Sequence, residues 1–281
     1  MFGQERYHAF FTRRITRSLR VLAAASILQA SYSVGSTDIH IVSEEFPPLQ
    51  SQGAQGKTGY VHQLLQEALR RASKTYPIRI ASYEFLPWKR ALLKAEMSPN
   101  TLLYSLSRTV EREPKYQWLA EVSVYRQSLF KLESNRALNI DSLSQLKHSG
   151  AALSVQNGSA TQQYLESLGY SKDSDFRTFI HYQQGIKQLY KGRIDLIPLN
   201  QLTARIAACK LGLDGNLLTP AIPVESLSKP LWAVFSKQTP PALVAAVRQA
   251  ISDIKHEGLF DQYYAQAMLS WENTPCQLAA K

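Results

Sequence analysis

Residues 152–169 read ALSVQNGSATQQYLESLG, and this stretch decides the fold class. Its apolar start predicts a short buried strand, which the turn dipeptide Asn157-Gly158 ends. Ser159 is a typical N-cap for the helix that follows, and Gly169 stops that helix. The same order of strand, turn and helix already begins at Ile39, so a second α/β unit starts near residue 152.

The first unit begins with the apolar run Ile39 to Ser43, which the prolines of Glu44-Glu45-Phe46-Pro47-Pro48 end. A helix with one apolar face follows Thr58, and Ile78 to Tyr83 reads as the next strand. Alternating strands and helices predict parallel pairing. We therefore expect an α/β protein with two lobes, each a mostly parallel sheet flanked by helices, with a ligand cleft between them.

The first 36 residues have the order of a secretory signal peptide. Five arginines come first, then the apolar run Val21 to Leu28, then a small or polar stretch. The apolar run is shorter than the roughly 20 residues of a membrane span, which disfavours the alternative of an anchor. We expect cleavage near residue 36 and a secreted, periplasmic protein.

Net charge disfavours a nucleic-acid partner. The chain carries +10 at pH 7, of which residues 1–36 supply +4 through five arginines and one glutamate, so a cleaved chain keeps +6. The remaining lysines and arginines are dispersed without a long run. We expect a monomer with a small-molecule ligand.

Two cysteines, Cys209 and Cys276, remain after the predicted leader. An oxidising compartment permits a disulfide between them. The sequence leaves two alternatives open, a disulfide that ties the C-terminal tail to the segment after residue 208 and a pair of free thiols.

Motifs for known catalytic or cofactor chemistry do not occur. The chain has no GxxxxGK, GxGxxG, HExxH, GxSxG or paired CxxC pattern, and its six histidines lack metal-ligand spacing. We therefore expect no metal, no cofactor and no enzymatic activity.

Polar and aromatic residues gather where predicted strands end and helices begin, the edge at which open α/β sheets bind ligands. Hydroxyls and guanidinium groups at such positions suit a carboxylate. A helix start at Gly158-Ser159 offers free backbone N–H groups to the same anion. These candidates are Glu44, Glu45, Phe46, Trp88, Ser105, Ser107, Arg108, Arg112 and Ser159.

Several of these stretches resemble the extracellular solute-binding proteins of family 3, which include the polar amino-acid receptors of ABC transporters. The resemblance covers roughly residues 38–270. Its markers are Glu45-Phe46-Pro47-Pro48, Thr58-Gly59-Tyr60, the run from Leu103 to Arg112, Gln156-Asn157-Gly158-Ser159, Gly192-Arg193-Ile194-Asp195 and Gly258-Leu259-Phe260.

The resemblance implies a type II periplasmic binding protein fold. Residues 37–125 and 228–281 would form lobe 1, and residues 126–227 would form lobe 2. The two crossing segments would lie near Tyr125 to Ser128 and Glu225 to Lys229. It implies closure around an amino-acid-like ligand, for uptake with an ABC permease or for sensing with a membrane partner.

Ligand roles follow from the same resemblance. Phe46 would contact the ligand, Ser105 and Ser107 would line the cleft, and Arg112 or Arg108 would bind an α-carboxylate with help from Ser159. Asn200 stands where many amino-acid receptors have the aspartate that pairs with the α-ammonium, so a neutral amide replaces the expected charge. Glu45 and Trp88 complete the predicted site.

Two alternatives to a transport receptor remain at this point. Cyclohexadienyl dehydratases resemble the same family and need a positioned acid, for which Glu44 and Glu45 are the candidates. The other alternative is a ligand sensor that acts through a separate partner protein.

Overall fold

The computed structural model describes residues 35–135 and 138–276. The predicted signal peptide therefore lies outside the described residues, apart from its last two positions. No helix within the described ranges has the length and apolar character required to cross a membrane.

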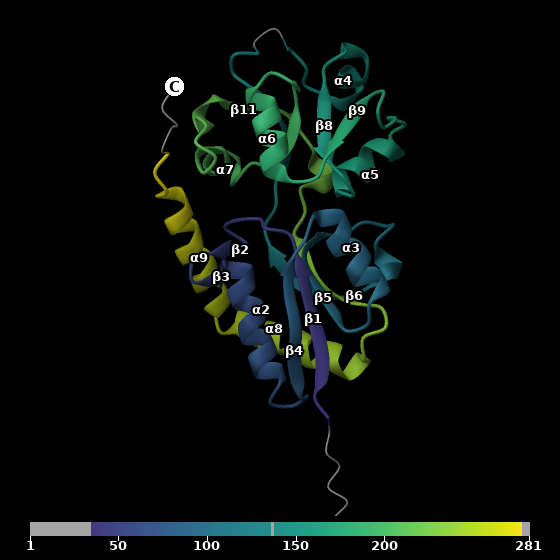
Figure 1. Ribbon diagram of the computed structural model, residues 1–281, viewed down its shortest axis with the longest axis vertical. Helices are drawn as coiled ribbons and strands as arrows, with labels where there is room; N and C mark the ends of the chain where they lie inside the picture. Colours follow the sequence, from purple (N-terminus) through teal and green to yellow (C-terminus); the bar gives the residue numbers. More distant parts are fainter. Residues whose placement is uncertain (1–34, 136–137, 277–281) are drawn as a thin grey trace, which may run out of the picture. The chain divides into compact units, whose positions relative to one another are not determined.

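The first lobe contains a five-stranded sheet in the order β4-β1-β5-β12-β6 (Figure 1). Strands β4, β1 and β5 run parallel, whereas β12 runs antiparallel to β5 and to β6. The bounds are β1 (Thr37–Ser43), β4 (Ile78–Phe85), β5 (Thr101–Ser107), β6 (Tyr116–Ser123) and β12 (Leu231–Ser236).

Helices cover both faces of this sheet, and successive strand residues serve opposite faces. Ile41 and Leu102 pack in the core under α2, α8 and α9, whereas their neighbours Val42 and Leu103 pack in the core under α3. The apolar runs in β1 and β5 are continuous for this reason. The helices are α2 (Tyr60–Ala72), α3 (Trp88–Met97), α8 (Pro241–His256) and α9 (Leu259–Glu272).

The second lobe has two small sheets, and both sheets contribute to each of its two apolar clusters. One is antiparallel in the order β10-β7-β11, and the other is the parallel pair β8-β9. The strands are β7 (Gln127–Leu132), β8 (Leu153–Gln156), β9 (Phe176–Phe179), β10 (Ile197–Asn200) and β11 (Leu218–Pro223); the helices are α4 (Leu143–Ser149), α5 (Ala160–Ser167), α6 (Tyr182–Tyr190) and α7 (Ala204–Cys209).

Short segments join the longer elements. They are the hairpin β2 (Ser51–Gly53) and β3 (Gly56–Thr58) and the 3₁₀ turns η1 (Glu113–Lys115), η2 (Gly215–Leu217) and η3 (Glu225–Leu227).

The chain crosses between the lobes at residues 124–126 and 224–230, next to the segments expected from the sequence. The crossings lie side by side, since the Val224 N–H donates to the Gln127 carbonyl at 2.9 Å and the Gln127 N–H donates to the Ser228 hydroxyl at 3.0 Å. The predicted two-lobed α/β class is confirmed. The sheets are more mixed than predicted, because β12 and the β10-β7-β11 sheet pair antiparallel.

A disulfide joins Cys209, the last residue of α7, to Cys276 beyond α9. Its two Cα atoms are 4.7 Å apart, although 67 residues separate them in the sequence. Helix α9 packs on the core of the first lobe through Phe260 and Tyr264 and extends towards α7 of the second lobe (Figure 1). The disulfide therefore links the two lobes.

Gly59 starts α2 in a conformation that a side chain does not tolerate. Its φ is 112°, and a Cβ there would lie 2.3 Å from the Leu49 carbonyl oxygen. We expect Gly59→Ala to lower the free energy of unfolding by more than the roughly 1–3 kcal/mol of backbone strain alone, measured by urea denaturation. Gly56→Ala is the matched control, because Gly56 has φ of 120° and open space around its Cβ. Equal losses in the two variants would contradict a steric role for Gly59.

Candidate functional site

Both lobes contribute to a cavity of about 60 Å³ near the crossing segments. The first lobe supplies the loop after β1, the start of α3 and the end of β5, and the second lobe supplies the end of β8 and the starts of α5 and α6. Its lining residues are Glu44, Phe46, Gln50, Trp88, Ser105, Ser107, Arg112, Tyr125, Gln127, Gln156, Ser159, Ala160, Thr161, Tyr182 and Leu231.

A β-bulge positions Ser105 at this cavity. The register between β5 and β12 shifts so that Tyr104 and Ser105 together oppose Ala233, and Ser105 has a φ of 60°. Bulges commonly redirect a side chain next to a functional site. The buried Ser105 hydroxyl donates to the Gln50 side chain at 2.8 Å, which ties the end of β5 to the loop after β1.

Arg112 is the buried cation of the cavity, with a relative exposure of 2%. Its Nη1 donates to the Ser107 carbonyl and its Nη2 to the Gly158 carbonyl, each at 3.0 Å, so it contacts both lobes. Burial lowers the pKa of its guanidinium to about 10, which leaves it charged at neutral pH. Among the described residues, no carboxylate lies within ion-pair distance of this group.

Trp88 supports the same cross-lobe contact. Its indole N–H donates to the Gly158 carbonyl at 3.2 Å, and its ring centroid lies 6.0 Å from the Arg112 guanidinium carbon. Gly158 presents this carbonyl from a left-handed turn with φ of 77°. One carbonyl of the second lobe thus receives two donors from the first.

Ser159 lies at the N-cap of α5, and its hydroxyl accepts from the Gln162 N–H. Ala160 and Thr161, the first two residues of the helix, also line the cavity. The N–H groups of a first helical turn have no carbonyl partner within the helix. The positive end of α5 therefore faces the cavity that contains Arg112.

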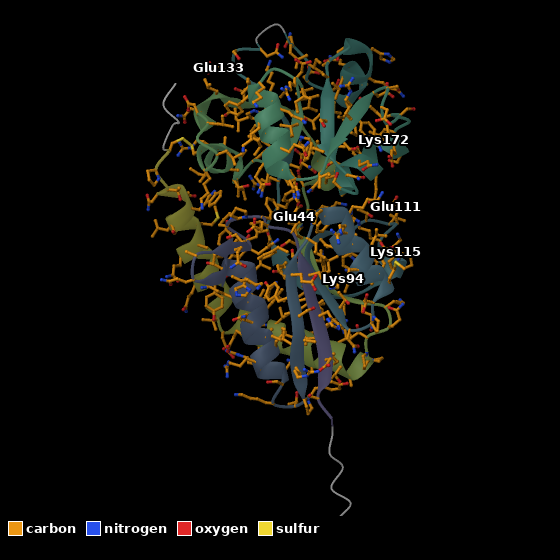
Figure 2. All side chains as sticks on the ribbon, viewed as in Figure 1. Glu44, Lys94, Glu111, Lys115, Glu133 and Lys172 are labelled. Carbon is orange, nitrogen blue, oxygen red and sulfur yellow. A yellow bond between two sulfur atoms is a disulfide. The ribbon has the colours of Figure 1, made fainter. Side chains whose placement is uncertain are left out.

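Glu44 is the buried carboxyl group of the cavity and follows the end of β1 (Figure 2). Burial raises its pKa to about 7, against the lowering effect of a hydrogen bond from Gln156 Nε2 at 2.5 Å. His181 Nδ1 of the second lobe lies 3.6 Å from the other carboxyl oxygen. The cavity thus carries a guanidinium that is charged at neutral pH and, in addition, a carboxyl group that titrates near neutral pH.

Three aromatic rings form a wall of the cavity. Phe46 lies parallel to Tyr182 with ring centroids 5.9 Å apart, and it contacts Tyr125 edge-on at 6.2 Å. Tyr182 comes from α6 of the second lobe, so this wall also spans the junction.

The structure brings seven of the predicted candidates to this cavity, namely Glu44, Phe46, Trp88, Ser105, Ser107, Arg112 and Ser159. Glu45 and Asn200 instead line a second, neighbouring cavity, and Arg108 lies outside both cavities. The Glu45 carboxylate accepts from the Gln52 N–H. Arg108 pairs with Glu113 and lies over Trp232, and Asn200 Oδ1 accepts from the Leu202 N–H.

Several lining residues, including Gln127, Gln156 and Tyr182, are not among the residues predicted from the sequence. Gln156 ends β8, and Tyr182 begins the helix after β9. Both residues therefore lie where a strand ends or a helix begins, the same signal that predicted Trp88.

No group of three or more potential metal ligands occurs among residues 35–135 and 138–276. The cavity residues instead offer hydrogen-bond donors, one cation and one carboxyl group.

Comparison with known proteins identifies the fold. No family model matches the chain, and no curated protein matches it. Many solved structures do match, and three with wide coverage illustrate the range.

One comes from a study of glutathione import by GshT and the cystine ABC importer TcyBC of Streptococcus mutans, with 14% identity, a TM-score of 0.68, and 88% and 99% coverage of this chain and that chain. The arginine-, lysine-, histidine-binding protein ArtJ of Geobacillus stearothermophilus matches with 16% identity and a TM-score of 0.67. The match covers 82% of this chain and 95% of ArtJ. A histidine kinase sensor domain similar to periplasmic binding proteins matches with 13% identity and a TM-score of 0.67. The match covers 83% of this chain and 96% of that domain. The chain therefore has the two-lobed fold of periplasmic binding proteins.

The raised pKa of Glu44 makes stability depend on pH. Its pKa is about 7 in the folded protein and near 4.5 without burial. Its contribution to the free energy of unfolding is therefore fully present below pH 4.5 and is lost as the pH rises through 7. We expect the free energy of unfolding to fall by roughly 3 kcal/mol as Glu44 ionises in the folded protein.

The Glu44→Gln variant should lack this loss, so its advantage over the natural protein should grow from pH 5 to pH 8. Urea unfolding of both proteins at four pH values measures the difference, in which contributions common to both cancel. A difference that does not change with pH would contradict the raised pKa.

Proposed function

We propose that this protein is a family 3 solute-binding protein that closes around a small anionic or zwitterionic, amino-acid-like ligand. It acts in the periplasm as a monomer, in uptake with an ABC permease or in sensing with a membrane partner, and it is not an enzyme. The main support for this proposal is the buried Arg112 guanidinium. It lines the interlobe cavity and has no carboxylate partner among the described residues.

A buried cation without a counter-charge is costly, and a ligand carboxylate supplies that charge. The start of α5 favours the same anion from the second lobe. A ligand bound between Arg112 and α5 contacts both lobes, so its binding favours the closed state. Similarity to ArtJ and to a sensor domain supports solute binding in either setting.

Glu44 supports the zwitterionic form of the ligand. Its carboxyl group lines the same cavity as Arg112, so an ammonium and a carboxylate on one ligand find opposite partners. A ligand ammonium next to Glu44 favours the ionised carboxylate. Glu44 thus supplies the anionic group that Asn200 does not provide at this cavity.

The test begins with a thermal-stability screen of amino acids, organic acids, polyamines and small peptides against the mature protein. A ligand at 100 times its dissociation constant should stabilise the fold by roughly 2.7 kcal/mol.

For a ligand found in this way, Arg112→Ala should weaken binding about 10- to 100-fold in calorimetric titration, since a charge-assisted hydrogen bond is lost. Arg112→Lys keeps the charge and loses the planar guanidinium. Its affinity for the ligand should lie between that of the natural protein and that of Arg112→Ala. Arg108→Ala is the matched control and should bind normally, because Arg108 lies outside the cavity. Unchanged affinity in a folded Arg112→Ala protein would contradict the proposal.

A second candidate function is elimination chemistry of the cyclohexadienyl dehydratase type. The observation that favours it is Glu44, a cavity carboxyl group whose pKa of about 7 suits proton transfer near neutral pH. We expect no turnover of prephenate or arogenate by the purified protein. Product formation that Glu44→Gln abolishes would instead establish the enzyme.

A further inference from the structure

We infer that the ligand carries an apolar tail of about four to six carbons, which binds in a second cavity behind the Phe46–Tyr182 ring pair. This inference rests on the proposed function, because the cavity of Arg112 would hold the polar head.

The second cavity has about 170 Å³, nearly three times the room of the first. Most of its walls are apolar side chains of α6, β10 and α7 with one indole from α9, and polar residues, among them Glu45, Asn200 and Lys210, complete its lining. The apolar residues include Ile186, Leu199, Ala204, Ala207, Leu211 and Trp271.

The two cavities share a wall. Phe46 and Tyr182 line both, and their parallel rings separate the polar cavity from the apolar one. Phe46 lies in the loop after β1, and Tyr182 is the first residue of α6. Because Phe46 belongs to a loop, its ring is the part of the shared wall that we expect to rotate when a tail passes from one cavity to the other.

Cavity size and polarity define the tail. An apolar cavity on the order of 150 Å³ stays dry and accommodates a benzene ring. A chain of four to six carbons has a comparable size, whereas the first cavity of about 60 Å³ leaves room for little beyond a head group. The expected ligand class is an α-amino acid with an aliphatic or aromatic side chain.

The test measures dissociation constants by calorimetry for a series with one head and a growing tail, from alanine through 2-aminobutyrate, norvaline and norleucine to 2-aminoheptanoate. Each buried methylene should tighten binding about fourfold. A series in which alanine binds and longer members bind no more tightly would overturn the inference and leave the proposed function intact. If no member of the series binds while another compound of the screen binds in an Arg112-dependent manner, the inference fails and the proposed function stands.

A cavity-filling variant locates the tail. Ala207 lines the second cavity and not the first, so Ala207→Phe should abolish the gain of norleucine over alanine and leave the affinity for alanine unchanged. Ala207→Ser is the matched control and should keep the gain. A folded Ala207→Phe protein that retains the full gain would overturn the inference.

Trp271 provides a readout that needs no variant in the cavity. It is buried, and its indole N–H has no hydrogen-bond acceptor among the described residues. In a spectrum of the four tryptophan indole N–H groups, norleucine should shift the Trp271 signal and alanine should not. Trp271→Phe identifies that signal. A Trp271 signal that both ligands leave unchanged at saturation would place the tail elsewhere and overturn the inference.

Discussion

The burial of one positive charge organises the junction between the lobes. Arg112 is withdrawn from solvent, and its two hydrogen bonds go to carbonyls of different lobes, Ser107 and Gly158. The second bond exists only when the lobes are together, because Gly158 belongs to the second lobe. The carbonyl dipoles solvate the guanidinium in part, but they carry no net charge. In the proposed function, closure and anion binding therefore depend on the same group, and each lowers the cost of the other.

Local sequence was sufficient for much of the site. The carboxyl ends of parallel strands meet at one edge, so residues such as Trp88, Ser105 and Ser159 were predictable from strand ends and helix starts. The sequence did not predict which of two neighbouring residues enters the cavity. Glu44 lines the cavity of Arg112, whereas Glu45 accepts from the Gln52 N–H of the following hairpin and lines the second cavity instead. That pairing depends on how the loop folds back, which strand periodicity does not encode.

The two arginines after β5 show the same limit. A tight turn, in which the Arg112 N–H donates to the Thr109 carbonyl, directs Arg112 inwards, and Arg108 remains outside against Glu113. Partners across the junction, such as Gln156 with Glu44, are 112 residues apart and leave no local pattern. The antiparallel pairing of β12 was also missed, because a strand's direction within a sheet depends on the connections of the whole chain.

The bond between Cys209 and Cys276 restricts the relative motion of the lobes. Two adjacent crossing segments alone would permit both bending and twisting. A third covalent attachment, some distance from the crossings and through α9, leaves a rotation about the line that joins the attachments as the main degree of freedom. Points near that axis move least. The Trp271 side of the junction should then move less than the Trp88 side.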